Sequence, residues 1–245
     1  MSSDAVRVSQ VPAALAAFDP AVIDRFEGVD DEAIDKLARM AKRELPEAYR
    51  AFLRWGGKRF DLDLWETDPT VKPLLEVYRR GEWLPPAEYL LIAAVKPNVD
   101  LDYDLYLRDA EGPEPSVVRI PFAQSGTFEE VRPALIDLGA PFSAILFGKL
   151  FLQVHLKRMG ATAFVGAHGL RQGLLADAHR TFKRLGFERH PLSGCNCSVY
   201  TRNDASALAM EQPGQPATVN LGAYHASTLR TLAGELEHDL GMRRA

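Results

Sequence analysis

Cysteine is nearly absent from this sequence of 245 residues: there are two, Cys195 and Cys197, with one residue between them. Cysteines this close cannot join distant parts of a fold, which excludes the disulfide framework of a small secreted protein. The first ten residues, MSSDAVRVSQ, also lack the basic start and apolar core of a secretory signal. We therefore expect a protein of the reducing cytoplasm.

Long uninterrupted hydrophobic runs are also missing. The most apolar segment, residues 140–156, is interrupted by Gly148, Lys149, Gln153 and His155. We predict a buried helix in this segment rather than a membrane span. The composition, 47% hydrophobic and 25% charged, is that of an ordinary globular protein and excludes a disordered or fibrous chain.

Signatures of catalysis are scarce. The six histidines are scattered, and none stands at a recognisable spacing from a serine or cysteine nucleophile. His190, Cys195 and Cys197 form the pattern H-x4-C-x-C, but zinc sites use four ligands and usually place two residues between cysteines. Structural cysteines at the start of a strand are the favoured interpretation, and a metal site is the alternative. No cofactor is expected.

Acidic and basic residues are distributed unevenly, although the formal net charge is only -4. Residues 60–115 contain 13 acidic and 5 basic side chains, whereas residues 155–190 contain 7 basic and 2 acidic ones. An acidic surface repels nucleic acid and membranes but attracts a basic protein, mainly by raising the association rate. Nucleic-acid binding is not expected, because the basic stretch lacks interleaved aromatic residues. The alternative is a solvated surface without a partner.

Helical periodicity dominates the first part of the chain. Residues 1–29 hold short apolar clusters between prolines and are expected to form a partly helical N-terminal arm. A helix follows from Asp30 or Asp31, a favourable N-cap, and its apolar face consists of Ile34, Leu37, Ala38 and Ala41.

A second helix is predicted to open at Pro46, in the first turn, where proline is tolerated. Its buried stripe is Tyr49, Phe52 and Leu53. Gly56 and Gly57 are predicted to end it, because glycine adopts the left-handed conformation of a helix C-terminus without steric cost.

The period of the apolar pattern then changes to two, which is typical of β-strands. Strands are predicted over residues 88–93, 100–108 and 116–120. Thr127 is predicted to cap a helix whose apolar residues are Phe128, Val131, Leu135 and Leu138. This order indicates an α+β fold with helices packed on a mostly antiparallel sheet.

Aspartates alternate with apolar residues in two stretches, which contain Asp61 and Asp63, and Asp100, Asp102 and Asp104. In an extended chain such residues project from one face, about 7 Å apart. A single row of carboxylates diverges, so it suits recognition of a protein better than binding of a divalent cation. The solvated outer face of an antiparallel sheet explains the pattern equally well.

The remaining residues predict a separate unit. Residues 159–173 are rich in glycine, and a flexible linker is favoured there over an anion site. Beyond it we predict a helix over 174–185, strands over 197–202, 205–211 and 217–221, and a helix over 225–240. The chain is therefore divided into an N-terminal arm (1–29), a main domain (30–158) and an appended α+β unit of helix, three strands and helix (159–245).

The stretch RELPEAYRAFLRWGGKRFDLDL, residues 43–64, contains the pattern Leu45-Pro46-x-x-Tyr49-x-x-Phe52-Leu53 followed by Gly56-Gly57, and Thr127-Phe128-Glu129-Glu130 opens a later helix. This arrangement resembles the SUKH superfamily, or SMI/KNR-type domain, over about residues 30–140. The asparagine common before the glycines of that family is absent here. The resemblance implies a non-enzymatic fold that bacteria widely use as immunity proteins, which bind and neutralise a toxin domain.

Resemblance and charge together lead to the hypothesis of an immunity protein that binds a cognate toxin domain through an acidic surface. The candidate toxin-binding residues are Asp61, Asp63, Trp65, Glu66, Asp68, Asp100, Asp102 and Asp104, with Trp55 and Trp83 as further candidate anchors. A scaffold or regulatory binding module of the same fold is the alternative, and a metal-dependent enzyme centred on His190 and Cys195 is the third. The toxin chemistry and the oligomeric state have no sequence signal.

Overall fold

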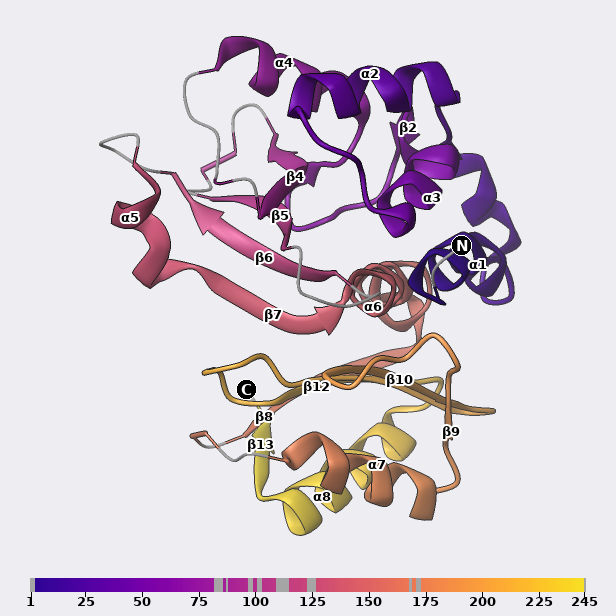
Figure 1. The fold of residues 1–245 in the computed structure, drawn as a ribbon. Helices are drawn as coiled ribbons and strands as arrows, with labels where there is room; N and C mark the ends of the chain where they lie inside the picture. The colour runs from indigo at the N-terminus through magenta and orange to yellow at the C-terminus, as the bar shows by residue number, and fades with distance from the viewer. Residues whose placement is uncertain are drawn as a thin grey trace. The chain divides into compact units, whose positions relative to one another are not determined.

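The computed structural model describes residues 3–81, 86, 88–96, 99–100, 103–108, 115–122, 127–167, 169–170 and 173–244. The chain forms two compact units, Met1–Leu146 and Phe147–Ala245, called here the N-terminal and the C-terminal unit. Both combine helices with antiparallel sheets, so the predicted α+β class is confirmed (Figure 1). The division falls within helix α6 (Phe142–Val154), and the predicted domain limits at 30–158 and 159–245 stay a prediction.

The N-terminal unit is built on a five-stranded sheet of strand order β3-β4-β5-β6-β7, in which all neighbours are antiparallel. Strands β1 and β2 form a separate antiparallel pair. Its elements are α1 (Ser3–Ala16), η1 (Pro20–Arg25), β1 (Phe26–Glu27), α2 (Asp31–Ala41), α3 (Glu47–Gly56), β2 (Arg59–Phe60), β3 (Thr67–Asp68), α4 (Val71–Arg80), β4 (Tyr89–Val95), β5 (Tyr103–Arg108), β6 (Ser116–Pro121), α5 (Phe128–Val131), η2 (Arg132–Ala134), β7 (Ile136–Pro141) and the first part of α6.

The predicted helix pair corresponds to α2 and α3. Asp30 caps α2 by accepting a hydrogen bond from the Ala33 amide at 2.9 Å. The stripe of α3 is buried as predicted, with Tyr49, Phe52 and Leu53 at most 1% exposed. The predicted left-handed glycine is wrong, however, because Gly57 has φ −74°. A Cβ atom on this residue would lie 2.6 Å from the Leu53 carbonyl oxygen, so lack of space is what favours glycine here.

The predicted helical content of the N-terminal arm is present as α1, which covers residues 3–16. This helix packs against α3. Its residues Val8, Val11 and Leu15 are fully buried. Pro12 lies inside the helix. Residues buried with a spacing of three or four are the signature of an amphipathic helix, so α1 belongs to the core of the N-terminal unit.

The helix predicted from Thr127 to Leu138 is wrong in its second half. After the single turn of α5 and the 3-10 turn of η2, the chain extends into β7, which pairs with β6. Pro133 lies in the 3-10 turn, and a proline cannot supply the amide hydrogen that a continuing helix needs. Leu138 is fully buried, but as a strand residue.

The C-terminal unit is a six-stranded antiparallel sheet of order β13-β8-β12-β11-β10-β9, with α7 and α8 on one face (Figure 1). Buried side chains of both helices, among them Phe182 and Leu236, share one hydrophobic core with strand residues such as Tyr200 of β10. After α6 its elements are η3 (Leu156–Arg158), β8 (Ala161–Ala167), α7 (Leu174–Arg184), β9 (Glu188–Arg189), β10 (Cys197–Arg202), β11 (Ala205–Met210), β12 (Thr218–Ala223), α8 (Ala226–Leu240) and β13 (Met242–Arg244).

The flexible linker predicted over 159–173 is wrong where β8 forms, because this strand pairs with β12 on one side and β13 on the other. The three predicted strands are present as β10, β11 and β12, and β8, β9 and β13 complete the sheet. The apolar segment is a buried helix as predicted: Phe147, Leu150 and Phe151 of α6 are fully buried. No helix of the described residues is long and apolar enough to cross a membrane.

Candidate functional site

Five of the predicted site residues lie together in one short segment, Asp61–Asp68, called here the acidic turn. Asp61 and Asp63 are exposed, whereas Leu62 and Leu64 between them are 7% and 2% exposed. The predicted alternation of solvated aspartates and buried leucines is therefore confirmed in this segment. The leucines anchor the acidic turn to the N-terminal unit, and its carboxylates face outward.

The tip of the acidic turn has an uncommon backbone. The Thr67 amide donates to the Leu64 carbonyl at 3.1 Å, which closes a β-turn over Trp65 and Glu66. Both central residues have positive φ, 55° and 61°, as in a type I′ turn. That turn favours asparagine and glycine, and the left-handed region costs about 1–2 kcal/mol for a residue with a larger side chain. The Asp63 carboxylate helps to hold the turn by accepting from the Glu66 amide at 2.7 Å.

The ring of Trp65 is held by an arginine from the sheet. The Arg119 guanidinium lies 5.3 Å from the Trp65 ring centroid and 5.1 Å from that of Tyr103, within the range of a cation–π contact on both sides. Burial lowers the pKa of Arg119, and no carboxylate among the described residues lies within ion-pair distance of it. Arg119 was not predicted, because a lone arginine between two apolar strand residues carries no signal of its partners.

Most carboxylates of the acidic turn are already engaged within the protein. Asp61 pairs with Arg59 at 3.0 Å, and Asp63 lies 3.6 Å from Lys96. Asp68 accepts hydrogen bonds from the amide and hydroxyl of the residue two positions on, at 2.9 and 2.6 Å. Glu66 is exposed, and its carboxylate has no ion pair with any described residue. The acidic turn therefore presents less free negative charge than its composition suggests, and that charge is concentrated at its tip.

The second predicted aspartate row does not form as expected. Asp104 is only 7% exposed, so the prediction that it projects into water is wrong. The reason is that both faces of β5 are covered: Leu105, Tyr106 and Leu107 are at most 1% exposed. Asp100 is exposed, whereas Asp102 lies outside the described residues.

Asp104 instead lines a pocket of about 320 Å³ in the N-terminal unit. The pocket walls come from α4, β4, β5 and the residue that follows β6: Val77, Arg80, Ala94, Val95, Asp104, Tyr106 and Phe122. Burial raises the pKa of Asp104 from its ordinary value of 3.8 to about 6, and a hydrogen bond from the Val95 amide opposes this only in part. A buried carboxylate with a raised pKa in a concave site is a recognised mark of function.

The two other tryptophans do not extend the site. Trp55 lies in an aromatic cluster, with its ring centroid 4.9 Å from Phe26 and 5.0 Å from Phe52. This placement makes it a packing residue of the N-terminal unit. Trp83 lies outside the described residues.

Two residues of the alternative metal site, His190 and Cys197, are engaged in packing. The His190 ring stacks on Phe147 at 4.3 Å between centroids, and its Nδ1 accepts from the Leu192 amide at 3.1 Å. Cys197 is buried, which raises the pKa of its thiol to about 12, and Cys195 is exposed. Among the described residues, no group of three histidine, cysteine or acidic side chains is placed to hold a metal ion.

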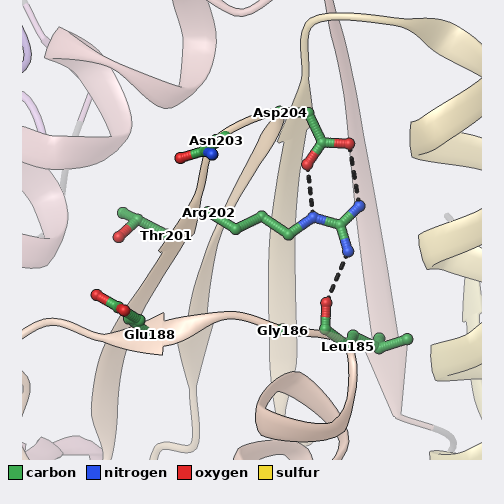
Figure 2. A pocket seen from close by; sticks show the side chains of 7 residues that line it. All are labelled: Leu185, Gly186, Glu188, Thr201, Arg202, Asn203 and Asp204. Atoms are coloured by element: carbon green, nitrogen blue, oxygen red, sulfur yellow. Dashed lines mark hydrogen bonds and ion pairs between the residues drawn. The ribbon is translucent and has the colours of Figure 1, made fainter.

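A larger, polar pocket of about 610 Å³ lies in the C-terminal unit, at the end of α7 (Figure 2). Its central side chain, Arg202, binds both oxygens of Asp204, at 2.6 and 3.2 Å, and donates to the Leu185 carbonyl at 2.7 Å. Its guanidinium also lies 4.8 Å from the Phe187 ring centroid. Because Arg202 is occupied by these internal contacts and satisfies the carbonyl that ends α7, its role is structural.

The candidate site thus consists of the acidic turn and the Asp104 pocket, both in the N-terminal unit. β3, which ends the acidic turn, pairs with the end of β4 that lines the pocket.

A scan of the chain against protein-family models finds no match, and a search against curated proteins also finds none.

Proposed function

We propose that this chain is an immunity protein of the SUKH type, which neutralises a cognate bacterial toxin domain by binding it through the acidic turn. The observation that carries the proposal is the tip of this turn. Two large residues, Trp65 and Glu66, occupy left-handed positions that favour asparagine or glycine. Such strain is retained where the side chains themselves are needed, and it clusters at binding sites.

The acidic turn is also ordered before any partner binds. Its backbone is closed by the hydrogen bonds at Thr67 and Glu66, and Arg119 holds the Trp65 ring. Binding by a segment that is already ordered loses less conformational entropy, which favours high affinity. Tryptophan is enriched among residues that dominate binding energy, and Trp65 is half-buried rather than enclosed.

The charge of the turn favours a basic partner. Glu66 offers a free carboxylate at the tip, and Asp61 and Asp63 remain exposed beside it despite their ion pairs. Negative charge at the edge of an interface mainly speeds the encounter with a positively charged surface. Many toxin domains that act on nucleic acid have such surfaces, because phosphate binding requires them.

The resemblance that motivates the family assignment is compatible with the burial of its motif. Leu45, Tyr49, Phe52 and Leu53 are all at most 4% exposed. They act as core residues, and the Tyr49 hydroxyl donates to the Ile92 carbonyl of β4 at 3.4 Å. The motif therefore supports the framework, and recognition is left to the acidic turn.

The test is co-expression with the toxin domain encoded beside the gene, with bacterial growth and the association rate as readouts. Glu66→Lys should slow association at least tenfold at low salt and weaken protection. Glu188→Lys, an equal charge change at an exposed position of the C-terminal unit, is the matched control and should leave both unchanged. Full protection and unchanged binding by a Glu66→Lys, Trp65→Ala double variant would refute the proposed surface, and absence of any protection by the parent chain would refute the function.

A further inference from the structure

The Asp104 pocket adjoins the acidic turn through the register of the sheet. Ala94 and Val95 line the pocket, and they pair with Asp68 and Thr67 of β3. The next residue, Lys96, donates its amide to the Glu66 carbonyl at 3.2 Å. The pocket therefore lies beside the segment that carries the acidic turn, within the same unit.

The carboxylate in this pocket is buried without a counter-ion. Asp104 Oδ1 accepts from the Val95 amide at 2.8 Å. Oδ2 accepts no hydrogen bond from the described residues, and no described lysine or arginine lies within ion-pair distance of the carboxylate. A single hydrogen bond compensates only part of the cost of burying a charge, so this residue destabilises the folded protein when it is ionised. A group retained at such a cost indicates a ligand that supplies the missing charge.

The walls of the pocket suit an alkyl stem that ends in a cation. Tyr106 lies two residues beyond Asp104 on β5, so both side chains project from the same face. Val77 of α4 adds an aliphatic surface, and Phe122, directly after β6, is 42% exposed. Aromatic rings beside a carboxylate attract an ammonium group through their negative faces.

We propose that this pocket binds the side-chain ammonium of a lysine on the protein partner. The proposal rests on the proposed function, because that function makes the ligand part of a protein. Lysine is favoured over arginine, since a guanidinium pairs best with both oxygens of a carboxylate and Asp104 has only Oδ2 open. The ammonium is a point charge that needs one strong acceptor. Arg80 also lines the pocket, and its charge opposes the incoming cation.

The test uses a small cation in place of the partner. The full chain is titrated with n-butylammonium, and the amide signal of Val95 is followed by NMR. A saturable shift of this signal is expected, at least tenfold weaker in Asp104→Asn and unchanged in Asp100→Asn, which alters an exposed aspartate. Arg80→Gln should strengthen binding by several fold, and n-propylguanidinium should bind more weakly than n-butylammonium.

Three results would overturn the proposal: no saturable shift at Val95, an equal shift with neutral n-butanol, or equal binding by the Asp104→Asn variant. Tighter binding of n-propylguanidinium would overturn the choice of lysine. Asparagine preserves the acceptor for the Val95 amide, so the variant is expected to fold. Because no toxin is present, failure of this titration leaves the growth assay on the acidic turn as an independent test of function.

Discussion

Replacement of Asp104 by asparagine should stabilise the N-terminal unit at neutral pH and have little effect in acid. Asparagine has nearly the same shape and keeps an oxygen for the Val95 amide, but it carries no charge to bury. The pKa of the native carboxyl is raised to about 6, mainly by burial. The folded protein therefore binds this proton more tightly than the unfolded chain, so stability falls as the pH rises from about 4 to about 6 and then levels off.

The magnitude follows from the two pKa values of Asp104. The change from 3.8 to about 6 corresponds to about 3 kcal/mol, at about 1.4 kcal/mol per unit. Ionised Asp104 thus costs up to about 3 kcal/mol at pH 7, and Asp104→Asn should recover most of it. The neighbouring ionisable groups are Tyr78, Tyr106 and Arg80. Burial raises the pKa of both tyrosines above its ordinary value of 10, so neither tyrosine changes charge between pH 4 and pH 7.

Urea unfolding of the full chain, followed by tryptophan fluorescence, measures this effect selectively. All three tryptophans, Trp55, Trp65 and Trp83, lie in the N-terminal unit, so the signal reports its unfolding and not that of the C-terminal unit. The free energy of unfolding of variant and parent should differ most at pH 7 and converge near pH 4. Asp100→Asn, at an exposed position, should show no such convergence. A difference that is independent of pH, or a variant less stable than the parent at pH 7, would refute the reasoning.

Outcomes are also expected for four further substitutions. Glu66→Gly should raise the free energy of unfolding by about 1 kcal/mol, because glycine adopts φ 61° without strain. Urea unfolding followed by tryptophan fluorescence measures this change. Arg202→Lys should destabilise the C-terminal unit by about 1–3 kcal/mol, measured by far-UV circular dichroism, because lysine cannot make the bidentate contact. Gly28→Ala should lower the free energy of unfolding by about 3 kcal/mol or more, since its Cβ would lie 1.9 Å from the Arg54 carbonyl oxygen. Gly234→Ala has open space around the new Cβ and should stabilise α8 by about 0.5–1 kcal/mol. Urea midpoints that do not separate these two variants would contradict this reasoning.

The helices that were predicted well are those whose signals are local. In α2, the cap at Asp30 and the apolar spacing lie within one short stretch, and in α3 the buried stripe has the period of a helix. The prediction for the segment after Thr127 failed because its apolar residues satisfy a helical spacing, although Leu138 lies in strand β7. Pairing of β7 with β6 decides between the two, and such pairing is not encoded within the segment.

The candidate site was predicted in part for the same reason. The exposure of Asp61 and Asp63 follows from alternation with leucines, which is visible in the sequence. The burial of Asp104 does not, because alternation predicts one solvated face only when the sheet has one uncovered side. Arg119, which holds the Trp65 ring, comes from a strand far along the chain and carries no signal of that contact.

The sequence alone determined the α+β class, the helices α2 and α3, the buried apolar helix α6 and the outward aspartates of the acidic turn. Each of these features depends on a periodic pattern within one short stretch of the chain. Only the tertiary structure decided that α1 packs in the core, that 161–167 is a strand between two others, and that Asp104 lies in a pocket beside the acidic turn. These features depend on which surfaces distant segments cover, and burial by a distant segment sets both the conformation of an ambiguous stretch and the charge state of a carboxylate.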